Sequence, residues 1–199
     1  MGQSLSRAFC IAFITAALLL PASLPVTAAT ATWQIDPAHT AAQFAVKHLL
    51  ISTVRGEFKG VTGTVSWDDQ DISKSSVNVT IDATTVDTGT PMRDNDLKSA
   101  SYFDVAKFPT ITFKSTKIEK AGPGNLNVTG DLTIHGVTKS VVLAVEGPSA
   151  AIKDPWGNTR AAISATTKVN RQDFGVSGGA GAVGDDISII IDLEMIKQK

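Results

Sequence analysis

Apolar and polar side chains alternate with a period of two along most of the chain from Thr32 onward. A period of two places one set of side chains on each face of a β-strand, and helical periodicity is rare in this sequence. The last segment is the clearest example, because Ile187, Ile189 and Ile191 share one face while Asp192 lies on the other. The pattern predicts an all-β fold.

About eight antiparallel strands are expected from the alternation. The first covers 43–48, and a longer second one contains glycines that predict a bend. The eight predicted strands lie at 43–48, 54–67, 77–81, 111–118, 126–134, 141–145, 163–169 and 187–195. Turn-forming residues at 121–125 and 154–158 separate neighbouring strands.

One segment lacks the alternation. Residues 92–99 are compatible with a helix and follow Pro91, which suits a first helical turn, so we expect a short helix over one end of the sheet. Eight antiparallel strands with one apolar face can close as a sandwich or as a barrel, and the pattern alone does not choose between them. A barrel of this strand number can hold one small ligand.

Residues 1–29 differ in composition from the rest of the chain. Arg7 is their only charged residue, and an apolar-rich stretch covers 8–20. This composition predicts a cleaved signal peptide over 1–29 and one domain over 30–199. The apolar stretch of about thirteen residues is short against the roughly twenty that a membrane-spanning helix needs, which disfavours an uncleaved anchor. The expected location is the periplasm.

Cysteine content and charge exclude some classes of function. Cys10 is the only cysteine and lies in the predicted signal peptide, so the mature chain is expected to have no disulfide and no thiolate metal ligand. The whole chain has 18 basic and 19 acidic residues with no basic cluster. Nucleic-acid binding is disfavoured, because it depends on a patch of Lys and Arg that neutralises phosphates.

The glycine-rich segment 179–184 matches the spacing of a dinucleotide-binding fingerprint. That fingerprint requires a preceding strand and a following helix whose N-terminus faces the pyrophosphate. Here Asp185, Asp186 and an isoleucine-rich strand follow, and the two carboxylates would repel a phosphate. We interpret the segment as a hairpin loop.

The remaining candidate chemistry is sparse. His39, His48 and His135 stand at unrelated positions, so they could form a zinc site only if the fold brought them together. The Gly-x-Ser-x-Gly pattern occurs once after residue 29, as GVSGG at 175–179, but the glycine-rich segment follows it and not the helix that a nucleophile elbow requires. Paired acids at 68–69 and 185–186 fall in expected turns, where solvated carboxylates are ordinary. We predict no catalytic residue and no metal ligand.

Four segments carry recognisable motifs. They read DPAHT at 36–40 leading to FAVKH at 44–48, RD at 93–94 with SASYFD at 99–104, KFPTITF at 107–113, and GDLTIHGVT at 130–138. Shorter matches are GEF at 56–58, DPWG at 154–157 and DFG at 173–175. Together these segments resemble the YceI-like family of polyisoprenoid-binding periplasmic proteins, over nearly the whole chain after residue 29.

The resemblance implies an eight-stranded antiparallel lipocalin-like barrel and so chooses the barrel over the sandwich. It also implies a long apolar tunnel that holds an isoprenoid lipid, such as a polyprenyl lipid or a quinone tail, with no other cofactor. Many members have His before the Leu of the RDxxL segment, whereas this chain has Asp96 before Leu97. If that histidine contacts a headgroup in relatives, headgroup preference would differ here.

The apolar face of the strands is expected to line this tunnel. The predicted lining residues are Phe44, Val46, Phe58, Val65, Val77, Val79, Ile81, Ile111, Phe113, Leu132, Ile134, Val141, Leu143, Ile189 and Ile191. The same alternation would equally fill a dry core, so both interpretations stay open for each residue. Arg93, on the helix expected over the barrel mouth, is the candidate for a headgroup contact, against the alternative of a solvated or paired surface arginine.

Three functions are compatible with these observations. The first is a lipid carrier or storage protein, the second a small-molecule enzyme on the same barrel, and the third an interaction protein whose barrel is filled. An enzyme would need clustered polar groups with shifted pKa values at the mouth. An exposed edge strand could pair two barrels into a homodimer, and a lipid binder could contact a membrane transiently.

Overall fold

The alternating segments form strands that pair antiparallel into one sheet, which the computed structural model describes over residues 30–199. The predicted signal peptide lies outside the described residues. The strands are β1 (Ala31–Ile35), β2 (Ala41–His48), β3 (Ser52–Phe58), β4 (Val61–Trp67), β5 (Ser76–Asp82), β6 (Thr110–Gly122), β7 (Asn125–Ile134), β8 (Val137–Glu146), β9 (Ile152–Lys153), β10 (Thr159–Asn170) and β11 (Val183–Lys197). The helices are α1 (Pro91–Lys98) and the 3-10 helices η1 (Pro37–His39), η2 (Ile72–Lys74), η3 (Ala83–Thr85) and η4 (Arg171–Phe174).

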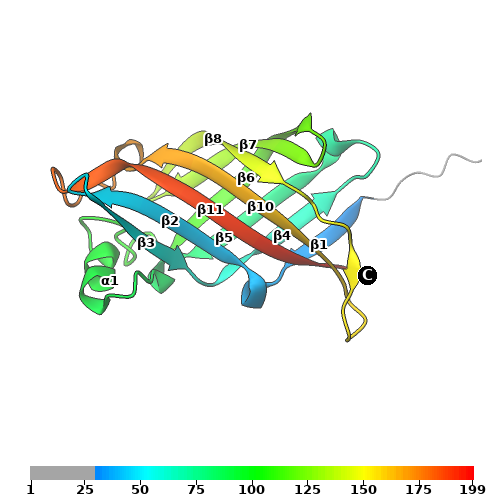
Figure 1. Cartoon of the computed structure of the whole chain (residues 1–199), viewed down its shortest axis with the longest axis horizontal. Helices are drawn as coiled ribbons and strands as arrows, with labels where there is room; N and C mark the ends of the chain where they lie inside the picture. Colours follow the sequence, from blue (N-terminus) through cyan, green and yellow to red (C-terminus); the bar gives the residue numbers. More distant parts are fainter. Residues whose placement is uncertain (1–29) are drawn as a thin grey trace, which may run out of the picture.

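The sheet closes into a barrel because β11 pairs with β10 as well as with β1 and β2 (Figure 1). β2 pairs with the first part of β11 and β1 with its last part, so β1 and β2 occupy one strand position that η1 interrupts. β3 and β4 likewise share one position, next to β2 and β1 respectively. The result is a closed antiparallel barrel of eight strand positions with one short α-helix, as predicted.

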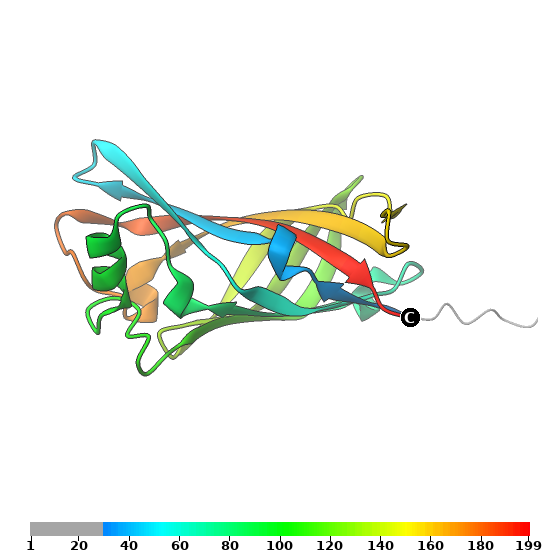
Figure 2. The same ribbon diagram turned by 90° about the horizontal axis from the view of Figure 1, so that it is seen from below.

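The two ends of the barrel are built differently (Figure 2). At the end where β1 begins and β11 finishes, here called the terminus end, strands form the wall. At the other end, here called the α1 end, β3 is the last strand of its side of the sheet among the described residues. A single bridge between Glu57 and Asp87 joins it to the segment 83–109, which contains η3 and α1 and covers this side.

Glycines produce the bend predicted in the second strand. The strand breaks at Lys59 and Gly60, where Gly60 has a φ of 67°. Gly63 has a φ of 148°, and a Cβ atom there would lie 2.1 Å from the carbonyl oxygen of Asn78 on β5. Only glycine allows β4 to approach β5 this closely.

The structure differs from the predicted elements in three places. β1 was not predicted, because only Trp33 and Ile35 are large apolar residues in so short a segment. The two-residue β9 was not predicted either, and the strand predicted at 54–67 is two strands. β1 is defined by its pairing with the distant β4 and β11. β9 is defined by its short hairpin with β10, and the split of the long strand by the break at Lys59 and Gly60.

The glycine-rich segment 179–184 forms a turn that leads directly into β11, as the loop interpretation requires. Within residues 30–199, the structure contains no helix of the length and apolar character needed to cross a bilayer.

Candidate functional site

An apolar cavity runs along the inside of the barrel. Its empty volume is about 1690 Å³, open space at its ends included, and the surface that it exposes is apolar. Trp67 and Leu126 line it near the terminus end, and Tyr102 and Phe174 line it at the α1 end. Ile35 is 2% exposed and is not among the lining residues, so it fills a separate part of the interior. The inward face of the strands is therefore packed in one region and hollow in another.

The structure brings together all but one of the residues predicted to line a tunnel. Those that line the cavity are Phe44, Val46, Phe58, Val65, Val77, Val79, Ile81, Ile111, Phe113, Leu132, Ile134, Leu143, Ile189 and Ile191. They come from β2 to β8 and from β11. Their contact with a ligand stays a prediction.

Val141 is the exception. It lies beside a second, shallower space between β8 and β10, and Phe174 lines both this space and the main cavity. β8 and β10 pair only between 144–146 and 164–166, so η4 and the 2%-exposed Phe174 lie where the two strands separate. Because β8 diverges from β10 here, Val141 packs against the core without lining the main cavity.

Sequence reasoning missed two kinds of lining residue. The first kind lies on strands, such as Val61, Val128 and Ile187, and the same alternation could have found it. The second kind lies outside the strands, such as Phe103 after α1 and Phe174 in η4. Alternation carries no signal for this second kind, since it describes only strand faces.

Aromatic rings join α1's segment to the barrel wall. The rings of Phe44 and Phe58 lie 5.6 Å apart, and Phe58 meets Phe103 edge to face at 5.3 Å. Aromatic pairs of this geometry add about 0.5–1.5 kcal/mol beyond area burial. The segment after α1 therefore completes the cavity wall through Phe103.

Arg93 does not line the cavity. Its Nε donates to the Thr88 hydroxyl at 2.7 Å, and its Nη2 donates to the Thr88 carbonyl at 2.8 Å and to the Thr90 hydroxyl at 3.1 Å. The backbone N–H of Thr88 in turn donates to the Asp94 carboxylate at 2.8 Å. Arg93 thus holds the loop before α1, and the headgroup contact expected from the sequence stays a prediction.

Arg171 is the charged residue that lines the cavity, and it is 5% exposed. Its Nε donates to the Gly184 carbonyl at 3.0 Å, and its Nη1 donates to the carbonyls of Val176 and Gly178 at 2.8 and 2.6 Å. Its Nη2 contacts the Val183 carbonyl and the Asp185 carboxylate, both at 3.1 Å. Four hydrogen bonds to backbone carbonyls and the ion pair with Asp185 hold the guanidinium, so Arg171 fixes the glycine-rich turn.

Tyr102 lies beneath the same glycine-rich turn. A Cβ atom on Gly178 would lie 2.6 Å from the Tyr102 ring, and the Gly178 N–H donates to the Ser101 carbonyl at 2.7 Å. Burial raises the pKa of the Tyr102 hydroxyl, and the negative charge of Asp96 raises it further. Tyr102 therefore stays neutral near pH 7, and its residue lines the α1 end of the cavity.

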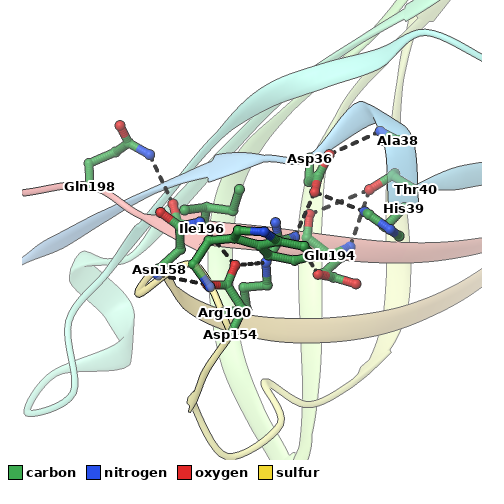
Figure 3. A network of polar contacts seen from close by, with 11 residues as sticks. Asp36, Ala38, His39, Thr40, Asp154, Asn158, Arg160, Glu194, Ile196 and Gln198 are labelled. Atoms are coloured by element: carbon green, nitrogen blue, oxygen red, sulfur yellow. Dashed lines mark hydrogen bonds and ion pairs between the residues drawn. The ribbon is translucent and has the colours of Figure 1, made fainter.

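A network of charged groups lies on the outer face of the barrel (Figure 3). Arg160 contacts the carboxylates of Asp36, Glu194 and Asp154 at 2.6, 2.6 and 2.7 Å. The hydrogen bond from Arg160, and next that from His39, lowers the pKa of Asp36 to about 2. Arg160 likewise holds the pKa of Asp154 well below its usual range. The network joins η1, β10 and β11 at the interruption between β1 and β2.

The same network contains the one group of metal-ligating side chains found among residues 30–199. Ligand atoms of Asp36, His39 and Glu194 lie within 4.8 Å of one another. The Arg160 guanidinium already binds both carboxylates and supplies the positive charge that a metal would bring. The group contains a single histidine, so the three histidines are not brought together as a zinc site would need.

Known proteins are similar to this chain in sequence and in fold. A UPF0312 protein of Vibrio parahaemolyticus is 40% identical over 161 residues, which is 80% of this chain and 85% of the relative. The crystal structure of a Campylobacter jejuni YceI protein has 33% identity and a TM-score of 0.68, with 77% of this chain and 90% of that one covered. A structure described as a polyisoprenoid binding domain from Saccharophagus degradans has 15% identity and a TM-score of 0.64, with 83% and 98% covered, and at this identity shows the fold alone.

The family follows from these matches and from the geometry. The profile of the YceI-like domain matches residues 33–195, which includes every strand of the closed barrel in whole or in part. The chain belongs to the YceI-like family.

Proposed function

We propose that this protein binds a long isoprenoid lipid, with a polyprenyl or quinone tail, inside its barrel. The observation that carries the proposal is the apolar cavity that the inward side chains of eight strand positions leave along the barrel, with an empty volume of about 1690 Å³ that includes open space at its ends. An elongated apolar guest completes such an interior. The polyisoprenoid binding described for the Saccharophagus degradans domain supports the same ligand class.

The tail supplies most of the binding free energy in this proposal. Each five-carbon unit that leaves water gains roughly 3–4 kcal/mol, at about 0.8 kcal/mol per carbon, before the costs of ordering the chain and the protein are subtracted. The polar groups at the cavity wall are few, because the surface that the cavity exposes is apolar and Arg171 donates to backbone carbonyls of the glycine-rich turn. Tail length therefore determines affinity more than headgroup does.

We further propose that the protein carries or stores this lipid in the periplasm without transforming it. The carboxylates with the largest pKa shifts, Asp36 and Asp154, belong to the Arg160 network on the outer face, away from the cavity. The composition of residues 1–29 supports export. Delivery would require transient contact with a membrane, and the part of the β3 edge before Glu57, which pairs with no further strand among residues 30–199, offers a surface for a homodimer.

The test is to purify the protein from the periplasm of its own host and to measure bound lipid by native mass spectrometry and solvent extraction. We expect a co-purifying isoprenoid. Ile189→Trp should reduce its amount severalfold, because Ile189 lines the cavity. Ile190→Trp is the matched control, because Ile190 is the next residue on β11 and is 42% exposed on the outer face. No lipid in the wild type, or equal loss in both variants, would contradict the proposal.

A further inference from the structure

The hairpin between β2 and β3 ends in three consecutive exposed apolar residues. Leu49 is 53% exposed, and Leu50 and Ile51 are each 84% exposed. Leu49 and Leu50 have φ values of 50° and 62°, in the left-handed region that bulky side chains rarely adopt and that turns usually fill with Gly or Asn. The turn therefore holds large apolar side chains in water at a cost in backbone strain, which points to a function outside the fold itself.

This tip stands at the α1 end (Figure 2), the end at which Tyr102 and Phe174 line the cavity. Phe44 and Val46 on β2 line the cavity, and Val54 on β3 pairs with Val46. The tip begins three residues beyond Val46, which is about 10 Å along an extended chain. Two pairs lie between Val46 and the tip, and of these only His48 and Ser52 are on the same face as Val46. The apolar face of the hairpin thus continues the cavity almost to the tip.

The barrel wall beside this hairpin is not closed by strand pairing. Among the described residues, the Glu57–Asp87 bridge is the only strand-type backbone pairing at the far edge of β3, beside the ring contact between Phe58 and Phe103. The side chains of Leu97 and Phe103, from α1 and the segment after it, line the cavity on the other side of this edge. A lipid tail could pass here by displacement of side chains, without the loss of a strand-to-strand ladder.

The charges of the hairpin fit an anionic lipid surface. From Ala45 to Arg55 the hairpin carries Lys47 and Arg55 and no Asp or Glu. Lys47 lies on the outer face, where its Nζ is 3.0 Å from the Thr53 hydroxyl. On the neighbouring strand, Asp185 is held by Arg171 and Gln172. An apolar tip flanked by cations is the arrangement of segments that lie at the boundary between headgroups and acyl chains.

We propose that the hairpin tip, Leu49 to Ile51, inserts into the surface of a phospholipid bilayer and that the isoprenoid passes between the bilayer and the cavity along Val46 and Phe44. The inference rests on the proposed function and names the surface through which the lipid is exchanged. The occupant is a bilayer and not a second copy of the chain, because the apolar tip is small, is flanked by cations and continues into an apolar cavity.

The test is co-sedimentation of the purified periplasmic protein with vesicles of phosphatidylethanolamine and phosphatidylglycerol. Leu50→Glu and Ile51→Glu should each lower the partition onto vesicles about tenfold or more, because each replaces an inserted apolar side chain with a carboxylate. Ile152→Glu is the matched control. Ile152 is 63% exposed on β9, which pairs with the start of β10 at the opposite end of the barrel, and its replacement should leave the partition unchanged.

Sites this exposed should tolerate substitution, and circular dichroism with thermal unfolding checks that each variant is folded. Equal sedimentation of the wild type and both tip variants, or no sedimentation of the wild type, would overturn the proposal. So would a tip substitution that dissociates a dimer in analytical ultracentrifugation and leaves vesicle binding intact.

Failure of this inference and failure of the proposed function give different results. If the protein co-purifies with an isoprenoid but does not bind vesicles, the proposed function stands and the membrane insertion of the hairpin tip is wrong. If the protein binds vesicles through Leu50 and Ile51, yet contains no isoprenoid and takes none up, the membrane insertion of the tip stands and the proposed function is wrong.

Discussion

The terminus end and the α1 end of the barrel use the same alternating strands for opposite purposes. At the terminus end, Ile35 and Met195 are 2% and 1% exposed, and the Arg160 network joins β10, β11 and η1 from outside. At the α1 end, the cavity wall includes α1, the segment after it and η4, none of which is a strand. Apolar side chains of the β2–β3 tip face water at this end. One end therefore holds the barrel together, whereas the other is the end at which we propose that the lipid enters and leaves.

The largest expected difference between the two regions is in the cost of removing an apolar side chain. Ile35→Ala should lower the free energy of unfolding by about 2–5 kcal/mol, because it creates a new void in a packed region. Ile189→Ala should cost clearly less in lipid-free protein, because Ile189 already borders empty space. Urea unfolding of both variants measures the difference. Equal costs would mean that the hollow region is packed after all.

Because of the Arg160 network, the unfolding free energy of the protein should depend on pH in the acidic range. The pKa of Asp36 is lowered from 3.8 to about 2 in the folded protein. A lowered folded pKa contributes stability above the unfolded value, and this contribution is lost as pH falls through the folded value. The expected loss is about 2 kcal/mol between pH 4 and pH 2, as order of magnitude.

The unfolding free energy of the wild type as a function of pH checks this prediction. Arg160→Gln removes the hydrogen bond that lowers the pKa of Asp36 most. The variant should therefore be less stable at neutral pH and should lose less unfolding free energy between pH 4 and pH 2. Parallel pH profiles for the wild type and the variant would show that Asp36 does not depend on Arg160.

The smallest expected effect is at the α1 end. Arg93→Gln removes the hydrogen bonds to Thr88 and Thr90, each worth about 0.5–1.5 kcal/mol, so the loop before α1 should exchange its amide hydrogens faster while global stability changes little. Hydrogen exchange followed by mass spectrometry measures this effect. We expect the bound lipid to be unchanged, because Arg93 does not line the cavity. Loss of lipid from a stable variant would instead support the headgroup contact expected from the sequence.

Much of the fold was predictable because most strands show the alternation of apolar and polar residues within their own sequence. The strands around Ile81, Phe113 and Leu132, and the helix after Pro91, lie where the sequence predicts them. β1 was missed because it depends on pairing with the last residues of β11, which lie far away in the sequence. The family resemblance, not the alternation, distinguished a barrel from a sandwich.

The candidate site was predictable where strands form it and not elsewhere. Alternation identifies Phe44 and Ile189 as inward residues, but it gives no reason to expect Phe103, Phe174 or Arg171 at the cavity wall. Those three residues lie in segments where apolar and polar side chains do not alternate, and their positions depend on how these segments pack across the α1 end. Val141 was wrongly grouped with the main cavity because its neighbour across the sheet, β10, separates from β8 there.

By itself, the sequence determined which side of each strand faces inward, since a period of two fixes successive side chains on opposite faces whatever the partner strand. Ile189 inside and Ile190 outside follow from that rule alone. Only the tertiary structure decided whether the inside is full or hollow, because empty volume depends on how many strands close the ring, how they tilt and which loops fold over the end. The same isoleucine would fill a core in a narrower barrel, and here it borders an apolar cavity.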